Sequence, residues 1–403
     1  MTPIKSQDFY QTKTELKFNL IKVLHCPKQV AGFPEMLSFY ERMLGFDSLS
    51  ISESYNPYSV NSNNILFNNK SNIYKRELKR LLLIYNAYLN CNILHLNNGQ
   101  FITPHFGNNI HPHELGFNCV SRFFIRFFTK ILTQTEMSLS SLRINNKAIF
   151  LTFQGSDARE TQCFINRYQK NNVAKELVSR SGRDNSSIRK KKIFLSQIAH
   201  KIYALNPDLL EVLPKTAEFL PYLYSFKPEH SDFNIQQNAN FIIGHAPTHR
   251  LGKGTDLIIK VVESIQKKFP NIKLVLIEKL SHSEALKKYQ EIDLFIDQLI
   301  IGWYGLVALE LMALGKPVIC FVKGKGIRFV PPQMLRDLPI INADEITLEE
   351  KILEVMKMDS VQRGNLAERG IRFLQKWHDP RKIAQRVVAD YKEVLSQRNL
   401  VRV

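Results

Sequence analysis

The chain lacks any run of about 20 apolar residues that could span a bilayer, and no apolar signal core follows its first lysine. Its cysteines are few and scattered, without a C-x-x-C pair: Cys26, Cys91, Cys119, Cys163 and Cys320. This spacing argues against a disulfide framework and against a zinc site built from thiolates, and it favours a reducing compartment. We therefore expect a cytoplasmic protein.

Several ligand-binding fingerprints are also missing. Neither G-x-G-x-x-G nor G-x-x-x-x-G-K-[ST] occurs, which counts against dinucleotide oxidoreductases and P-loop enzymes. No D-x-D occurs, and His105, His111 and His113 lie around prolines without a helical carboxylate–histidine pair, so we interpret them as loop histidines. The sequence predicts no metal site and no cofactor.

Size and composition describe an ordinary globular protein with a strong positive charge. The 403 residues are 44% hydrophobic and 23% charged, enough for two domains of normal size. The formal net charge of +18 permits a nucleic acid, an anionic lipid or an anionic substrate as partner. A basic surface in contact with solvent alone would explain the same charge. Because no nucleic-acid-binding module is recognisable, we consider a nucleic acid the least favoured partner.

Strand and helix patterns alternate along the chain. In the first half, the expected strands are 20–26, 46–52, 92–97 and 147–153, and in the second half they are 272–277, 293–296, 316–322 and 338–342. The helix expected over 73–89 has leucine and tyrosine at helical spacing, with lysine and arginine on its other face. Such alternation predicts an α/β fold of parallel strands joined by crossover helices.

The most informative stretch is 301–320, where one carboxylate, Glu310, lies among apolar side chains. A buried carboxylate requires a cation, hydrogen-bond donors or a polar ligand. The pattern predicts a strand, a connection marked by Gly302 and Gly305, and a helix starting at Leu306. The free amides at that helix end would form an anion site, with Glu310 roughly 6–7 Å along the helix, within reach of a ribose. The alternative is a structural ion pair between Glu310 and Lys316 or an arginine.

A second stretch, 240–256, carries two cations on a glycine-rich connection between a buried strand and a helix whose N-cap we expect at Thr255. Arg250 can bind a diphosphate in bidentate fashion, and Lys253 adds a point charge. A solvated turn carrying the same two cations is the alternative interpretation.

The two stretches together resemble the group 1 glycosyltransferases of the GT-B fold. The residues G-W-Y-G-L-V-A-L-E-L-M-A-L-G-K-P-V match the family pattern E-G-F-G-L-P-x-x-E-A-M-A-x-G-x-P-V, and the loop with Arg250 and Lys253 resembles a shortened R-x-x-x-x-K-G phosphate loop. The second glutamate of the family pair falls on Glu310, whereas the first falls on Gly302. Nearby Asp297 and Gln298 are the candidates to replace that first carboxylate.

The resemblance implies two facing Rossmann-like domains, with the nucleotide-sugar donor on the second and the acceptor on the first. Donor contacts are expected at Gly32, Gly302, Gly305, Leu306 and Asp297, and the catalytic candidates are Arg250, Lys253 and Glu310. The residues F-Q-G-S-D-A-R resemble the family's H-G-x-D-x-R turn, which places Asp157 and Arg159 on the acceptor side. A helix cap at Asp157 and a salt bridge at Arg159 explain the same residues without a ligand.

The expected organisation is an N-terminal extension (1–18), a first Rossmann-like domain (19–215), a linker (216–238), a second Rossmann-like domain (239–380) and a final helix (381–403) that crosses back to the first domain. Two basic segments, 122–130 and 180–192, suit either a solvated surface or peripheral contact with an anionic membrane at its inner face.

The predicted function is the transfer of a sugar from a nucleoside-diphosphate sugar to a glycan or lipid-linked acceptor, without a metal ion and with retention, as the resemblance implies. A sugar-nucleotide epimerase or hydrolase on the same fold would use the same donor site. A non-catalytic nucleotide-sugar-binding protein is the third hypothesis, because Gly302 and Gln154 replace a glutamate and a histidine of the family patterns.

Overall fold

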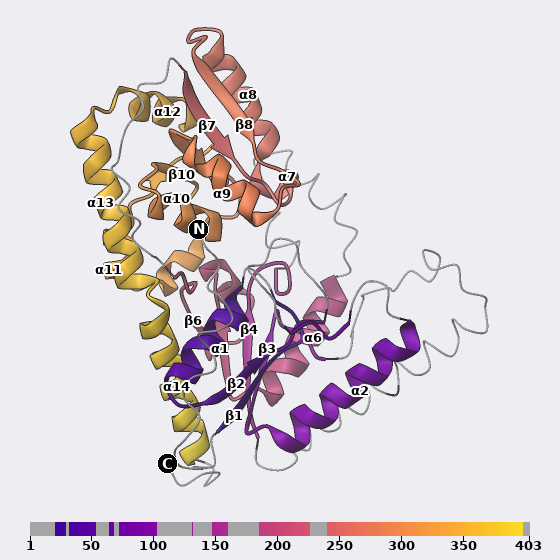
Figure 1. Ribbon diagram of the computed structural model, residues 1–403. Helices are drawn as coiled ribbons and strands as arrows, with labels where there is room; N and C mark the ends of the chain where they lie inside the picture. The colour runs from indigo at the N-terminus through magenta and orange to yellow at the C-terminus, as the bar shows by residue number, and fades with distance from the viewer. Residues whose placement is uncertain are drawn as a thin grey trace.

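The computed structural model describes residues 21–29, 32–53, 64–67, 72–102, 131, 147–159, 185–225 and 240–397. They form two parallel sheets, one from each half of the chain (Figure 1). The first sheet has the order β2-β1-β3-β4-β5-β6 and contains β1 (Lys22–Cys26), β2 (Asp47–Ser50), β3 (Ile93–Asn97), β4 (Ala148–Phe153), β5 (Lys201–Ala204) and β6 (Ala217–Phe219). The second has the order β11-β10-β9-β7-β8 and contains β7 (Phe241–His245), β8 (Ile272–Leu276), β9 (Leu294–Ile296), β10 (Val318–Cys320) and β11 (Ile341–Asn342). The predicted α/β class with parallel strands is confirmed.

Helices cover both faces of the first sheet. On one face, α1 (Phe33–Met43) and α14 (Pro380–Gln397) pack together over buried side chains that include Val23, Phe33, Leu37, Ala384 and Val387. On the other face, α2 (Ile73–Asn90) and α6 (Asn185–Ile198) bury Leu83, Ile84, Leu195 and Ile198. The last helix of the chain therefore completes the core of the first sheet, as the expected crossing helix should (Figure 1).

A buried polar network joins α14 to this sheet. His25 and His95 are register partners on β1 and β3. The ring of His95 bonds the hydroxyl of Tyr391 through Nδ1 (2.5 Å) and Oγ1 of Thr152 through Nε2 (2.7 Å). His25 Nε2 lies 2.8 Å from a carboxylate oxygen of Glu41 on α1. Burial, followed by the nearby His25, holds the pKa of His95 well below its usual value, so its ring is neutral and can both donate and accept a hydrogen bond.

The second sheet is also covered on both faces. Its helices are α7 (Arg250–Lys253), α8 (Thr255–Gln266), α9 (His282–Gln290), α10 (Leu306–Ala313), α11 (Pro332–Asp337), α12 (Leu348–Lys357) and α13 (Ser360–Trp377). On one face, α8 and α12 bury Ile258, Val262, Ile352 and Val355. Elsewhere, α10 and α13 approach so closely that a Cβ on Gly370 would lie 3.4 Å from Met312.

The two halves meet along short helical turns and at one histidine. The 3₁₀ turn η4 (Lys325–Phe329) packs on η3 (Pro207–Glu211), where a Cβ on Gly326 would lie 2.6 Å from the carbonyl oxygen of Pro207. His378 donates from Nδ1 to the carbonyl of Tyr222 (2.8 Å) and accepts at Nε2 from the hydroxyl of Tyr304 (2.9 Å). Burial lowers the pKa of His378 to about 4, so this contact between the halves uses a neutral ring.

Some predictions differ from the structure or lie outside its described residues. Thr255 is not the N-cap of α8, because Gly254 holds that position with a φ of 77° and Thr255 is buried. The segment predicted as a linker, 216–238, includes the last strand of the first sheet, β6. The extension 1–18 and the basic segment 122–130 lie outside the described residues, as do the three loop histidines. Among the helices that the structure describes, none is long and apolar enough to cross a bilayer.

Candidate functional site

The site is built at the carboxyl ends of β7 and β9. After β7 the chain makes a single helical turn, α7, with His249 as its N-cap. The Nδ1 atom of His249 accepts a hydrogen bond from the backbone N–H of Gly252 at 3.0 Å. Gly254 then adopts the left-handed conformation that lets α8 start at once. His245, the last residue of β7, donates from Nδ1 to the carbonyl of Ile296 (2.7 Å) and accepts from Oγ1 of Thr255 (2.9 Å). Burial lowers the pKa of His245 to about 4, so a neutral ring links β7, β9 and α8.

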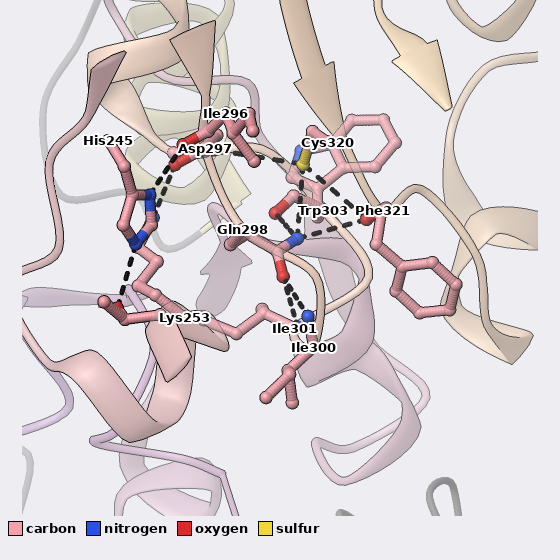
Figure 2. A network of polar contacts seen from close by, with 12 residues as sticks. His245, Lys253, Ile296, Asp297, Gln298, Ile300, Ile301, Trp303, Cys320 and Phe321 are labelled. Carbon is pink, nitrogen blue, oxygen red and sulfur yellow. Dashed lines mark hydrogen bonds and ion pairs between the residues drawn. The ribbon is translucent and has the colours of Figure 1, made fainter. Parts of the chain in front are cut away.

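Lys253 and Asp297 form the centre of the site (Figure 2). The ammonium of Lys253 lies 2.6 Å from Oδ1 of Asp297, and the amide of Gly305 donates to Oδ2, also at 2.6 Å. Asp297 is 1% exposed, so its charge depends on these two partners. A carboxylate of the chain thus occupies part of the anion position predicted at the start of α10.

The loop into α10 is shaped by its glycines and by Gln298. Gly302 has a φ of 86°, a conformation that favours glycine, which gives a backbone reason for the residue that replaces the family's first glutamate. A Cβ on Gly305 would lie 3.4 Å from Nζ of Lys253, so glycine leaves room for the cation. The amide nitrogen of Gln298 donates to the carbonyls of Trp303 (2.8 Å) and Phe321 (3.1 Å). Gln298 is fully buried and supports the loop, which leaves Asp297 as the candidate carboxylate near a donor sugar.

Helix α10 presents its N-terminus to the same region. Its first residue is Leu306, and helix geometry gives the first amides, including those of Leu306 and Val307, no acceptor within the helix. The amide of Gly305 is already bonded to Asp297. The remaining N–H groups and the helix dipole favour an anion at this point.

Glu310 pairs with a residue that the sequence did not suggest. Its Oε1 lies 2.7 Å from Nε2 of His282, the first residue of α9, and Glu310 is 5% exposed. This hydrogen bond raises the pKa of His282, since the carboxylate stabilises the imidazolium. The proposed alternative partner Lys316 instead donates to the carbonyl of Gln290. Helix α9 begins with a capping box, in which Ser281 and Glu284 bond reciprocally.

Arg250 lies on the predicted loop but is directed to another partner. Its guanidinium makes two hydrogen bonds to the carboxylate of Glu278, with Nε at 2.7 Å from Oε1. Half of the arginine side chain is exposed. The structure therefore joins Lys253, Asp297 and Gly305 directly, and it places Arg250 in a separate ion pair.

The residues predicted for the acceptor side have structural partners in the first half of the chain. The carboxylate of Asp157 accepts from the amides of Gln154 (3.0 Å) and Gly155 (2.6 Å), and Arg159 pairs with Asp208 at 2.7 Å. The ion pair of Arg159 matches the salt-bridge alternative, whereas the carboxylate of Asp157 bonds amides that precede it in the chain, which is not the pattern of a helix N-cap. An acceptor role for Asp157 and Arg159 stays a prediction. Gly32 lies at the N-cap of α1, with a left-handed φ of 69°.

Two half-buried tyrosines, Tyr222 and Tyr224, are affected by charges of the candidate site. Burial raises the pKa of Tyr222 to about 12, and the charges that act on it include those of Arg159 and Asp297. Tyr224 has a pKa raised by burial and by the charge of Glu310, so its hydroxyl stays protonated near that carboxylate. The sequence gives no indication of His282, Tyr222 or Tyr224, because no motif pairs them with residues so distant in the chain.

The described residues contain one group with the composition of a metal site, His25, Glu41 and His95, whose ligand atoms lie within 4.8 Å of one another. It is buried in the first sheet beneath α1 and α14, away from Lys253 and Glu310. Both ring nitrogens of His95 take part in hydrogen bonds, and Nε2 of His25 is bonded to Glu41, so we interpret the group as a polar network of the core. Within it, Nδ1 of His25 and Oε1 of Glu41 have no hydrogen-bond partner among the described residues.

Comparisons with known proteins identify the fold. No protein-family model matches the chain, and no curated protein matches it. Among solved structures, a sucrose-phosphate synthase from Thermosynechococcus elongatus covers 94% of this chain and 100% of its own, with 13% identity and a TM-score of 0.56. A glycosyltransferase from Rickettsia africae covers 94% and 99%, with 14% identity and a TM-score of 0.52.

A third similar structure is that of Anabaena Alr3699/HepE in complex with UDP and glucose, which covers 93% of this chain and 100% of its own, with 10% identity and a TM-score of 0.54. At these identities the likeness concerns the fold. The protein has the GT-B fold, two Rossmann-like α/β domains with the C-terminal helix returning to the first domain.

Proposed function

We propose that this protein is a glycosyltransferase that moves a sugar from a nucleoside-diphosphate sugar to a glycan or lipid-linked acceptor. The observation that carries the proposal is the convergence of the Lys253 cation, the N-terminus of α10 and the nearly buried Glu310 in one GT-B domain. The similar structures include a glycosyltransferase and a protein solved with UDP and glucose, which supports the same assignment.

In the proposed mechanism the diphosphate lies against the first turn of α10. Lys253 and the amides of Leu306 and Val307 stabilise the negative charge that develops on the departing nucleoside diphosphate. Glu310 accepts hydrogen bonds from the ribose hydroxyls, and His282 fixes the orientation of its carboxylate. The cationic and amide contacts take the role that a bound metal ion has in metal-dependent enzymes, so we propose a reaction without metal or cofactor. We further propose that the sugar configuration is retained, as the family resemblance implies.

Asp297 has two roles in this proposal. It holds Lys253 at the helix terminus before the donor binds, so little reorganisation of the cation is needed. Its second oxygen lies at the loop that carries Gly302, where the resembling family has a carboxylate near the donor sugar. Arg250 contributes from the rim after exchanging Glu278 for phosphate oxygens.

The test is a thermal-shift measurement with nucleoside diphosphates and their sugars. A ligand present at 100 times its dissociation constant stabilises the folded protein by about 2.7 kcal/mol. We expect Lys253→Ala and Glu310→Ala to lose that shift, each measured against its own ligand-free melting temperature. The matched controls are Lys351→Ala and Glu354→Ala, which change the two partners of a partly exposed ion pair on α12. Equal ligand shifts in all four variants would disprove the donor site.

Product analysis separates the proposal from the two other hypotheses. A transferase consumes the nucleotide sugar at a rate that depends on added acceptor, whereas a hydrolase or an epimerase converts it without one. A non-catalytic binding protein is favoured by one observation, the neutralisation of Lys253 by an internal carboxylate, and it would show the ligand shift without any turnover.

A further inference from the structure

Helix α2 is apolar on two opposite faces. Its inner face, with Leu83, Ile84, Ala87 and Tyr88, packs into the core of the first sheet. The lysines and arginines that we expected opposite the buried face occupy only part of the outer surface of α2. The outer face also carries large apolar side chains: Leu78, Leu81, Leu82, Tyr85 and Leu89. A helix with one buried face normally presents polar residues on the other, so this outer face requires an explanation.

The outer apolar residues form one continuous stripe. Their spacing of three, one, three and four residues places all five on the same side of the helix. Each is between 43% and 60% exposed. They make up five of the fifteen large apolar side chains that are exposed in the described part of the chain, and the others are distributed over many elements. Contiguous exposed apolar surface of this kind marks an interaction site.

The charges around the stripe are positive. Lys75 and Lys79 lie exposed along one edge of it. The single carboxylate of α2, Glu77, is buried and paired with Arg80, so it does not offset them. On the same face of the sheet, α6 exposes Arg189 and Lys190, whereas Lys192, from the basic segment noted in the sequence, is buried and donates to the carbonyl of Val212. The stripe therefore lies in a positively charged surface.

We propose that the outer face of α2 docks on an anionic membrane surface. The leucines and Tyr85 would enter the boundary between headgroups and acyl chains, while Lys75 and Lys79 contact anionic headgroups. A second copy of this chain is a poorer occupant, because a symmetric contact would bring together surfaces of a protein with a net charge of +18. The proposal does not depend on the glycosyltransferase activity, since it concerns a different face and has its own readout.

The test is co-sedimentation of the full chain with phosphatidylcholine vesicles, with and without phosphatidylglycerol. We expect binding to the anionic vesicles and much weaker binding to the neutral ones. The variant Leu82→Gln/Tyr85→Gln should bind the anionic vesicles at least about tenfold more weakly, because the apolar area it removes no longer leaves water. Lys75→Gln should lower the affinity about fivefold through the loss of one cation.

The matched control is Ile346→Gln/Val361→Gln, which alters two apolar residues of the second domain that are 84% and 68% exposed. It should bind the vesicles as the unchanged protein does. All variants change exposed side chains, and circular dichroism verifies that they are folded. Equal vesicle binding by the α2 variant and the control would overturn the proposal. So would sedimentation analysis showing a dimer that the α2 variant abolishes, without any binding to vesicles.

Discussion

At the scale of single residues, ion pairing explains how the protein tolerates two buried carboxylates in the site. Glu310 has His282 as its partner, and Asp297 has Lys253 together with the amide of Gly305. Leaving either carboxylate without its partner would cost several kcal/mol. Each pair therefore allows a carboxylate to remain inside the protein.

The pair of Glu310 and His282 makes the stability of the fold depend on pH. The folded-state pKa of His282 is raised by its hydrogen bond to Glu310, so the imidazolium contributes stability below the unfolded-state pKa of about 6.5. That contribution is lost as the pH rises through the folded-state pKa. We expect the free energy of unfolding in urea to fall over this range in the unchanged protein. In His282→Gln the free energy of unfolding should fall less over the same pH range. Identical dependence on pH in the variant and the unchanged protein would contradict the pairing.

At the scale of the secondary-structure elements, the junction of η3 and η4 fixes how the two domains meet. Gly326 packs against the backbone at Pro207, where no side chain can move aside. We expect Gly326→Ala to reduce stability by about 1–3 kcal/mol, through overpacking of this contact. Urea unfolding measures the effect.

The control for that substitution is Gly364→Ala, in the second turn of α13, where, outside the helix's own backbone, an added Cβ would meet no atom of the described residues within 4 Å. Removing a glycine from a helix should raise stability by roughly 0.5–1 kcal/mol. Changes of opposite sign in the free energy of unfolding of the two variants would distinguish the steric effect at η4 from the general effect of adding a methyl group. A neutral Gly326→Ala would show that the two turns can separate at little cost.

The elements were largely predictable from the sequence, but their partners were not. Patterns in the sequence located most of the strands and the start of α10, but not β5 and β6. Local patterns cannot show that Lys253 meets a carboxylate 44 residues further along the chain, or that Arg250 faces Glu278. They also misplaced the N-cap at Thr255, because its hydroxyl is used by a buried histidine of the preceding strand.

At the scale of the whole molecule, α14 connects the end of the second domain to the core of the first. Its Tyr391 is fully buried, and its hydroxyl bonds His95 on β3. Tyr391→Phe would leave a ring nitrogen of His95 without a partner in a buried site, which we expect to cost about 1–3 kcal/mol in urea unfolding.

The exposed residue Tyr85 provides the control for this substitution, since Tyr85→Phe changes the same group in contact with water. Its stability should remain within about 0.5 kcal/mol of the unchanged protein. A loss of equal size in both variants would mean that the buried hydrogen bond does not hold α14 in place.

The position of α14 also determines the order in which the protein can fold during synthesis. The core between α1 and the first sheet includes Ala384, Val387 and Leu395, which the ribosome adds only after the whole of the second domain. The second domain lies entirely before these residues in the chain, so it can complete its own core earlier. A nascent chain therefore carries an incompletely covered N-terminal half until α14 has been synthesised.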